Sequence, residues 1–336
     1  MLSQLYYVLL YSFSLAISVI GLIACLSMLI VIVSHSQCRT PLNLPICSTA
    51  VSIFLVLSIN IINCFYGFRE DWISDQPLCR LRAYLIMAIG GVTSYSYLIQ
   101  SIQRLFINIY YKKKYLVNYK AHLYMIILNW LIPFSCTAVP LFFQDAFRYE
   151  AESRLCILTI KKYALSAYVM TSQFLIPFSA GVAVYLKILF YAIAAPKITP
   201  SAMSNHDQRM NNLKREKKVA RQMIKILGIN CLMGVPYLVF ILWYGIDSKS
   251  LPPEPLYLLF YHMVILGIAV TMLSVFRMNK QIMGIIFARL GIQQNNIDQP
   301  TVQRWRFRIN LSYWQNEVEL IINSRKISIC LCLNIR

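Results

Sequence analysis

A long stretch without charge is the feature that most constrains this chain. No charged side chain occurs between Arg82 and Arg104. A charged side chain at the centre of a membrane costs about 3 kcal/mol, so such a stretch is typical of a membrane-spanning helix. Cys79 and Arg104 are about 25 residues apart, or roughly 37 Å at the helical rise, which exceeds a hydrocarbon core of about 30 Å. We therefore expect these two residues at opposite faces of a membrane.

Six further apolar runs follow the same pattern. The chain has 336 residues, of which 58% are hydrophobic and 13% charged, and this is too apolar for a soluble domain of that length. The fold class expected is an all-α membrane protein, a seven-transmembrane helix bundle with a short amphipathic eighth helix. The predicted spans are 6–33, 44–67, 79–111, 122–143, 163–194, 218–245 and 255–277.

The predicted domains follow from these runs. A seven-transmembrane domain is expected over 1–290, and it includes an amphipathic helix at 279–290 that would lie on the membrane surface and contact lipids. A mostly disordered cytoplasmic tail is expected over 291–336. No cleavable signal peptide is evident, because the first run is long enough to span a membrane.

The net charge of +19 reflects the orientation of the chain in the membrane and does not indicate a nucleic-acid partner. The basic residues gather in the connections after the first, third and fifth runs, whereas the other connections mix both signs. Because cytoplasmic loops carry the excess of Lys and Arg, we expect an extracellular N-terminus and a cytoplasmic C-terminus. The prediction is a multi-pass protein of the plasma membrane.

Several short motifs resemble those of the rhodopsin-like (class A) G-protein-coupled receptors, over roughly residues 6–290. Each motif alone is weak, but together they occur at the spacings of that family. The resemblance is carried by TPLN at 40–43, Trp72 with Cys79, SIQRL at 101–105, Trp130, Pro177 with Tyr185, and REKKVAR at 215–221 leading to Pro236.

The resemblance implies a receptor and not an enzyme. Its expected partners are an extracellular ligand and a heterotrimeric G protein. It also implies a disulfide between Cys79 and Cys156, although two free thiols are the alternative. Two other functions stay open: a receptor-fold scaffold or decoy that does not couple, and a transporter or channel. The latter is disfavoured because the spans carry almost no buried charge.

Four positions depart from the family pattern. Ile53 stands where an acidic residue is expected, so we expect the sodium pocket to be lost. Gln103 replaces the acid beside Arg104, and Gly234 replaces an aromatic switch residue. The stretch that matches the Asn-Pro-x-x-Tyr motif reads TMLSV at 271–275.

Arg104 and Glu216 form the predicted switch. A guanidinium at the mouth of a helix bundle needs a partner or water, and Glu216 lies about 20 residues before Pro236, near the same face. We expect the two to pair at rest and to separate when helix six moves outward, which would free Arg104 and Tyr185 for the G protein. The alternatives are that Arg104 marks the positive boundary and that Glu216 belongs to a solvated charge run.

The predicted ligand pocket lies among the outer halves of helices three, five, six and seven. Such a stripe of residues is often packing alone, and about half of these positions would be core. Ile86 disfavours an amine ligand, since the amine receptors of the family that this chain resembles carry an Asp at that position to pair with the ammonium group. No span holds a Lys suited to a retinal Schiff base, and no metal spacing is present, so no cofactor is expected. A neuropeptide or small neutral ligand remains. The pocket positions are Ile86, Met87, Gly90, Val169, Gln173, Tyr237, Ile241, Tyr244, Tyr261 and His262.

Overall fold

A computed structural model describes most residues between 4 and 285, and most of these residues are helical. The described residues belong to one compact unit, Met1–Arg289. The described residues are 4–35, 38, 40–41, 43–68, 76–110, 113–150, 153–194, 203–246, 254–279 and 282–285.

Seven long helical segments form a bundle, and each is long and apolar enough to cross a membrane. The predicted seven-helix membrane fold is therefore confirmed. The first four segments are α1 (Gln4–Ser34), α2 (Leu44–Phe68), α3 (Gln76–Asn108) and α5 (Tyr119–Ala138), with the short helices α4 (Lys114–Val117) and η3 (Val139–Phe142) between or after them. The last three are α6 (Tyr163–Met170) continued by η4 (Thr171–Leu175) and α7 (Ile176–Ala194), then α8 (Met203–Ile246) and α9 (Glu254–Met278).

The fifth span contains a wider helical turn that the sequence analysis did not predict. In η4 the Ile176 N–H donates to the carbonyl of Thr171, five residues earlier. Pro177 follows directly and has no N–H for the carbonyl four residues before it, which favours a local departure from α geometry. The turn redirects the side chains of residues 171–175.

The sixth span extends further than the hydrophobic run predicted. α8 begins at Met203, whereas the apolar part suited to a membrane begins at Arg221. Residues 203–218 contain neither proline nor glycine, so nothing in this polar stretch ends the helix.

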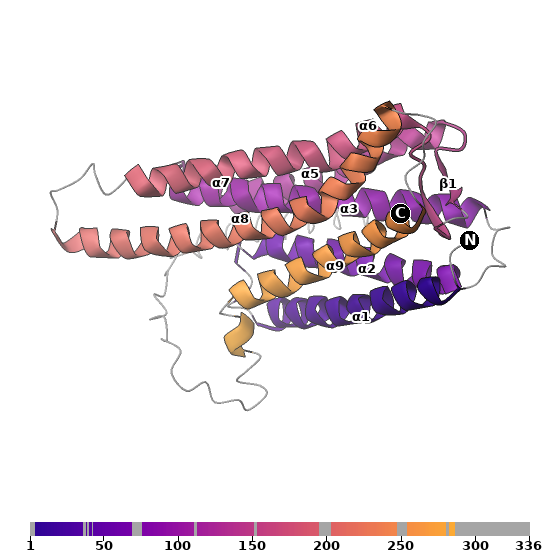
Figure 1. The fold of residues 1–336 in the computed structure, drawn as a ribbon. Helices are drawn as coiled ribbons and strands as arrows, with labels where there is room; N and C mark the ends of the chain where they lie inside the picture. The colour runs from indigo at the N-terminus through magenta and orange to yellow at the C-terminus, as the bar shows by residue number, and fades with distance from the viewer. Residues whose placement is uncertain are drawn as a thin grey trace, which may run out of the picture. The chain divides into compact units, whose positions relative to one another are not determined.

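A two-stranded hairpin joins the fourth and fifth spans. β1 (Phe147–Glu150) pairs antiparallel with β2 (Leu155–Leu158), with Phe147 opposite Leu158 and Tyr149 opposite Cys156. All four β2 residues are buried. We call the end of the bundle that carries β1 and β2 the hairpin end; the N-terminal end of α1 lies there too (Figure 1).

α3 is the central helix of the bundle. It packs against α2, α5 and α7 and also against both strands (Figure 1). α1 packs between α2 and α9, and α8 packs between α7 and α9. α3 therefore contacts elements along its whole length, from the disulfide to Arg104.

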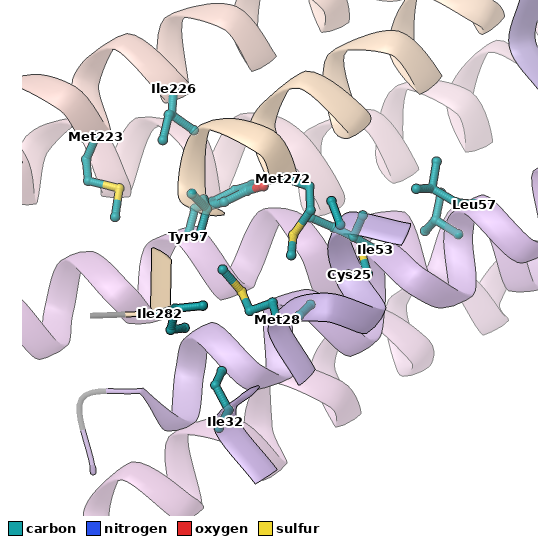
Figure 2. Close-up of a cluster of buried hydrophobic side chains, with 14 of the residues drawn as sticks. Cys25, Met28, Ile32, Ile53, Leu57, Tyr97, Met223, Ile226, Met272 and Ile282 are labelled. Carbon is teal, nitrogen blue, oxygen red and sulfur yellow. The ribbon is translucent and has the colours of Figure 1, made fainter. Parts of the chain in front are cut away.

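The fully buried residues of the main hydrophobic core come from all seven spans except the fourth, whose Phe134 packs against the core. Figure 2 shows Cys25 and Met28 of α1 beside Ile53 of α2 and Met272 of α9. Close packing depends on Gly21, where a Cβ would lie 2.5 Å from Leu57 Cδ1 and 3.3 Å from Ala269 Cβ. Small residues of this kind let membrane helices approach each other closely.

The predicted amphipathic helix at 279–290 is described only in part. Residues 282–285 are helical, and Ile282 is fully buried in the main core near Met28 (Figure 2). The remainder of that helix and the tail at 291–336 lie outside the described residues, as does Trp72.

Candidate functional site

The hairpin is covalently tied to the start of α3. Cys79 and Cys156 form a disulfide across 77 residues of sequence, with Cα atoms 5.2 Å apart, so the predicted bridge is present and the free-thiol alternative is wrong. Both residues are buried, together with Ala83 and Val169. The bridge fixes β2 over the hairpin end of α3.

The other end of the hairpin is held by α1. The Tyr11 hydroxyl donates to the carbonyl of Ser153 at 2.6 Å, and the Arg154 guanidinium lies 4.0 Å above the ring of Tyr7. Arg154 adopts a left-handed backbone conformation, with φ at 52°, which closes the turn between the strands. The hairpin thus reaches from α3 across to α1, and its buried β2 covers the helix ends between them.

A hydrogen-bonded chain of side chains joins α1, α2 and α9 beneath the hairpin. The Tyr261 hydroxyl donates to Asn60 Oδ1 at 3.0 Å and accepts from Asn63 Nδ2 at 3.2 Å. The Asn60 amide also donates to the hydroxyls of Ser14 at 3.0 Å and Ser18 at 2.9 Å. Asn60, Ser14 and Ser18 are essentially inaccessible to solvent. We call Ser14, Ser18, Asn60, Asn63 and Tyr261 the amide chain.

Sequence reasoning missed the two asparagines of the amide chain. A signal for them exists, because two amides three residues apart in an otherwise apolar span share a helix face and need polar partners there. Their partners on α1 and α9 depend on how the helices pack, which the pattern within one span does not reveal.

The predicted pocket positions fall into two groups. Ile86 is buried in the main core, with Met87 and Tyr261 packed against it. Ile241 is instead buried in a cluster with Ile160 and Met170, against which Tyr237 packs. The structure therefore does not gather all the predicted wall residues around one common cluster.

Four further pocket positions differ in their burial, in the space around them and in their hydrogen bonds. A Cβ on Gly90 would meet no other atom within 4 Å, so α3 has open space at that position. Val169 is fully buried beside the disulfide, and Tyr244 is half-buried. The Gln173 amide is used in packing: it donates to the carbonyl of Pro133 at 3.0 Å and to the Thr137 hydroxyl at 3.1 Å.

Arg104 lies on the last turns of α3, at the end opposite the hairpin. It is half-buried, and among the described residues its guanidinium has no hydrogen bond or ion pair. Its neighbour Gln103 is buried and donates to the carbonyl of Pro41 at 2.8 Å, so this side chain holds the connection between α1 and α2. Tyr185 is buried in the same core as Leu105.

Glu216 belongs to α8, but its side chain lies outside the described residues. The pair with Arg104 therefore stays a prediction. Pro236 lies inside α8, as the sequence indicates.

The departures from the family pattern have visible structural counterparts. A Cβ on Gly234 would lie 2.6 Å from Cζ of Phe174, so the ring of Phe174 occupies the space beside this glycine. Ile53 is fully buried in the apolar core of Figure 2. Thr271 accepts a hydrogen bond from Asn230 Nδ2 at 3.1 Å, which links α8 to α9. Each of these positions is thus packed or hydrogen-bonded within the bundle.

A seven-helix bundle with a disulfide-linked hairpin over one end and a half-buried arginine near the other defines a membrane receptor of the seven-helix class. The family model described as 7 transmembrane receptor (rhodopsin family) matches residues 25–274. The chain therefore belongs to the rhodopsin family of seven-transmembrane receptors, a family of receptors and not of enzymes, and it is a multi-pass membrane protein.

Two rhodopsins illustrate the similarity. The deep-sea form of rhodopsin from Anguilla anguilla is 23% identical over 219 residues, which are 64% of this chain and 61% of that protein. The match thus spans less than two thirds of the length of that relative. The crystal structure of squid rhodopsin superposes with a TM-score of 0.72 at 16% identity, covering 89% of this chain and 90% of that one. At this identity the superposition shows a shared fold.

Proposed function

We propose that this receptor senses an extracellular ligand at its hairpin end and activates a heterotrimeric G protein at its opposite end. The observation that carries the proposal is the position of Arg104 on α3. It lies within the family match, about 25 residues and roughly 37 Å along the helix from the disulfide at Cys79. A single helix thus reaches from the proposed sensing face to the proposed coupling face.

The orientation follows from the charges of the connections. The disulfide needs an oxidising compartment, which supports an extracellular position for the hairpin end. In the sequence, the connections that follow α3 and α7 are rich in Lys and Arg, and the positive-inside bias supports a cytoplasmic position for the end opposite the hairpin. On this basis the N-terminus is extracellular, the C-terminus is cytoplasmic, and the protein resides in the plasma membrane.

The proposed switch is the separation of α8 from α3. Arg104 and Glu216 pair in the resting state, and a ligand that binds the open state more tightly moves the coupling end of α8 outward about Pro236. The move frees Arg104 and exposes Tyr185, which is 1% accessible in the described state. Burial of Tyr185 supports this proposal because a contact with a G protein would require its release.

The proposed ligand is a neuropeptide or a small neutral molecule. Ile86 is 7% accessible and packs in the apolar core, so this position offers no carboxylate for an ammonium group. A cationic amine would lose its hydration there without gaining a partner.

Nucleotide exchange on purified Gα subunits tests the proposal. Arg104→Ala should lower receptor-catalysed exchange, basal or ligand-stimulated, by at least tenfold, whereas Lys113→Ala, which removes an exposed cation at the same end, should leave it within twofold. Equal rates for Arg104→Ala and the unaltered receptor would contradict coupling through this arginine.

One observation favours a second function, that of a receptor-fold scaffold or decoy. Phe174 fills the space beside Gly234, and Gln103 bonds to Pro41, so two positions of the family switch have other roles here. A screen of all Gα classes against a peptide library decides between the two functions. Silence in every combination, including the basal state, would support the decoy.

A further inference from the structure

Two glycines of α8 each lie against an aromatic ring of the fifth span. A Cβ on Gly234 would lie 2.6 Å from Cζ of Phe174 and 3.0 Å from both Cε atoms of that ring. A Cβ on Gly245 would lie 2.5 Å from Cε2 of Tyr163 and 2.9 Å from its Cζ. Carbon atoms pack best at about 3.5–4.0 Å, so each ring occupies space that any residue other than glycine would need.

The two contacts are equally spaced along both spans. Eleven residues separate Tyr163 from Phe174, and eleven separate Gly234 from Gly245. Eleven residues are about three turns of an α-helix, so the two glycines share one face of α8. Because the two spans run in opposite directions, the ring closer to the hairpin meets the later glycine. We call these two ring–glycine contacts the aromatic seam.

Apolar packing fills the seam between its two contacts. Ile160, Met170 and Ile241 form a buried cluster, against which Phe174 packs. The ring of Phe174 also stacks on Phe178, with centroids 5.6 Å apart and planes at 13°. Phe174 lies in the wide turn η4, and α8 packs against both α6 and α7 (Figure 1). The ring is thus held by the fifth span while its tip meets the backbone of α8.

Phe174 meets α8 where that helix bends most easily. Pro236 has no N–H for the carbonyl four residues earlier, which weakens the turn before it, and Gly234 lies in that turn. The packing towards the coupling end is looser. There, a Cβ on the buried Gly181 of α7 would come no closer than 3.9 Å to Leu227 of α8. The close contact of Phe174 therefore falls at the proposed hinge.

We propose that Phe174 is a positioning residue for the switch: its ring, seated on Gly234, sets the resting angle of α8 at Pro236. Packing along the rest of the seam holds the hairpin half of α8 against the fifth span, so the coupling half moves about this point. This inference rests on the proposed receptor function and names the contact that regulates its switch. Since a methyl group on Gly234 and the ring of Phe174 cannot both fit, bending of α8 relieves their overlap and favours the open state.

The test measures the distance between α3 and α8 in the full chain without G protein. Spin labels carried by unnatural amino acids at Ile107 and Arg221 report this distance in lipid–detergent micelles, and pulsed electron resonance resolves the closed and open populations. Gly234→Ala should raise the ratio of open to closed receptors about tenfold, or about 1.4 kcal/mol, which is within the usual cost of an added methylene in a packed core. Phe174→Leu in the same chain should return the ratio to that of the unaltered receptor, because the shorter side chain makes room for the methyl group.

Gly245→Ala is the matched control. Its methyl group overlaps Tyr163 in the same way, but it lies nine residues beyond Pro236 and away from the hinge. This variant should leave the ratio unchanged. Phe174→Leu alone keeps the test decisive if Gly234→Ala does not fold: the distribution of distances should broaden, because the ring no longer fixes the hinge.

Two results would overturn the inference. They are an equal ratio in Gly234→Ala and Gly245→Ala, and a distribution of distances that Phe174→Leu leaves unchanged. Nucleotide exchange is measured separately on the same variants. The expected ratios in a receptor that catalyses no exchange would support this inference and refute the coupling, whereas unchanged ratios in a receptor whose exchange depends on Arg104 would refute this inference alone.

Discussion

Replacing Asn60 by alanine should lower the free energy of unfolding by more than replacing a buried asparagine that makes a single hydrogen bond. Asn60 is completely buried, and its amide makes three hydrogen bonds to other helices, two to serines of α1 and one from Tyr261 of α9, besides a long one to Cys64 Sγ of its own helix at 3.7 Å. Its removal takes away the polar link between three helices at once.

The size of the effect follows from the number of bonds. Hydrogen bonds between membrane helices contribute on average about 0.6 kcal/mol each, since the unfolded chain in the membrane also finds partners. Three bonds therefore give about 2 kcal/mol for Asn60→Ala. Asn129 is equally buried but donates one bond, to Ser96 at 2.9 Å, so Asn129→Ala should cost about 0.6 kcal/mol.

The assay is reversible unfolding in lipid–detergent micelles with increasing dodecyl sulfate, followed by the loss of helical circular dichroism. A double-mutant cycle with Tyr261→Phe should give a coupling energy of about 0.6 kcal/mol for the Tyr261–Asn60 bond. A loss for Asn60→Ala no larger than that for Asn129→Ala, or a coupling of zero, would refute the amide chain as a link between these helices.

Three further predictions concern the two ends of the bundle. Cys79→Ser should lower the free energy of unfolding by about 4 kcal/mol, because the bridge closes a loop of 77 residues; a loss below about 1 kcal/mol would contradict this. Gly67→Ala should displace the ring of Tyr11, because the new Cβ would overlap Cζ of that ring, at a cost of about 1–3 kcal/mol. Hydrogen exchange at residues 153–155 should then be faster, and unchanged exchange would count against the anchor. Glu216→Gln should raise basal nucleotide exchange because it frees Arg104, whereas Glu216→Asp, which keeps the carboxylate, should stay near the rate of the unaltered receptor; equal basal rates for Glu216→Gln and the unaltered receptor would exclude the pair.

The helical spans could be predicted from the sequence because a membrane imposes a simple rule on charge. Residues 83–103 need no tertiary information to be identified as a span, and in the structure they lie inside α3. The same rule fails at the start of α8, because the helix continues into a polar stretch, where hydropathy does not distinguish a helix from a loop.

The hairpin could not be predicted from local pattern. Its strands have four residues each, and β2 is buried on both faces by helices that are distant in sequence. The pairing of Cys79 with Cys156 was expected from family resemblance, whereas the bond from Tyr11 to Ser153 depends on helix packing alone.

The candidate site was predicted in part. Tyr261 and His262 were expected at the ligand end, and the structure places both beneath the hairpin in the company of Tyr11. The role of Phe174 beside Gly234 was not foreseen, because the turn at η4 that orients this side chain has no clear signal besides Pro177.

The separation of α8 from α3 is the most direct test of the switch. Spin labels carried by unnatural amino acids at Ile107 and Arg221 avoid the native thiols, and pulsed electron resonance measures the distance between them. We expect a longer distance when nucleotide-free G protein is bound than in the receptor alone. An unchanged distance in a receptor that catalyses nucleotide exchange would contradict it.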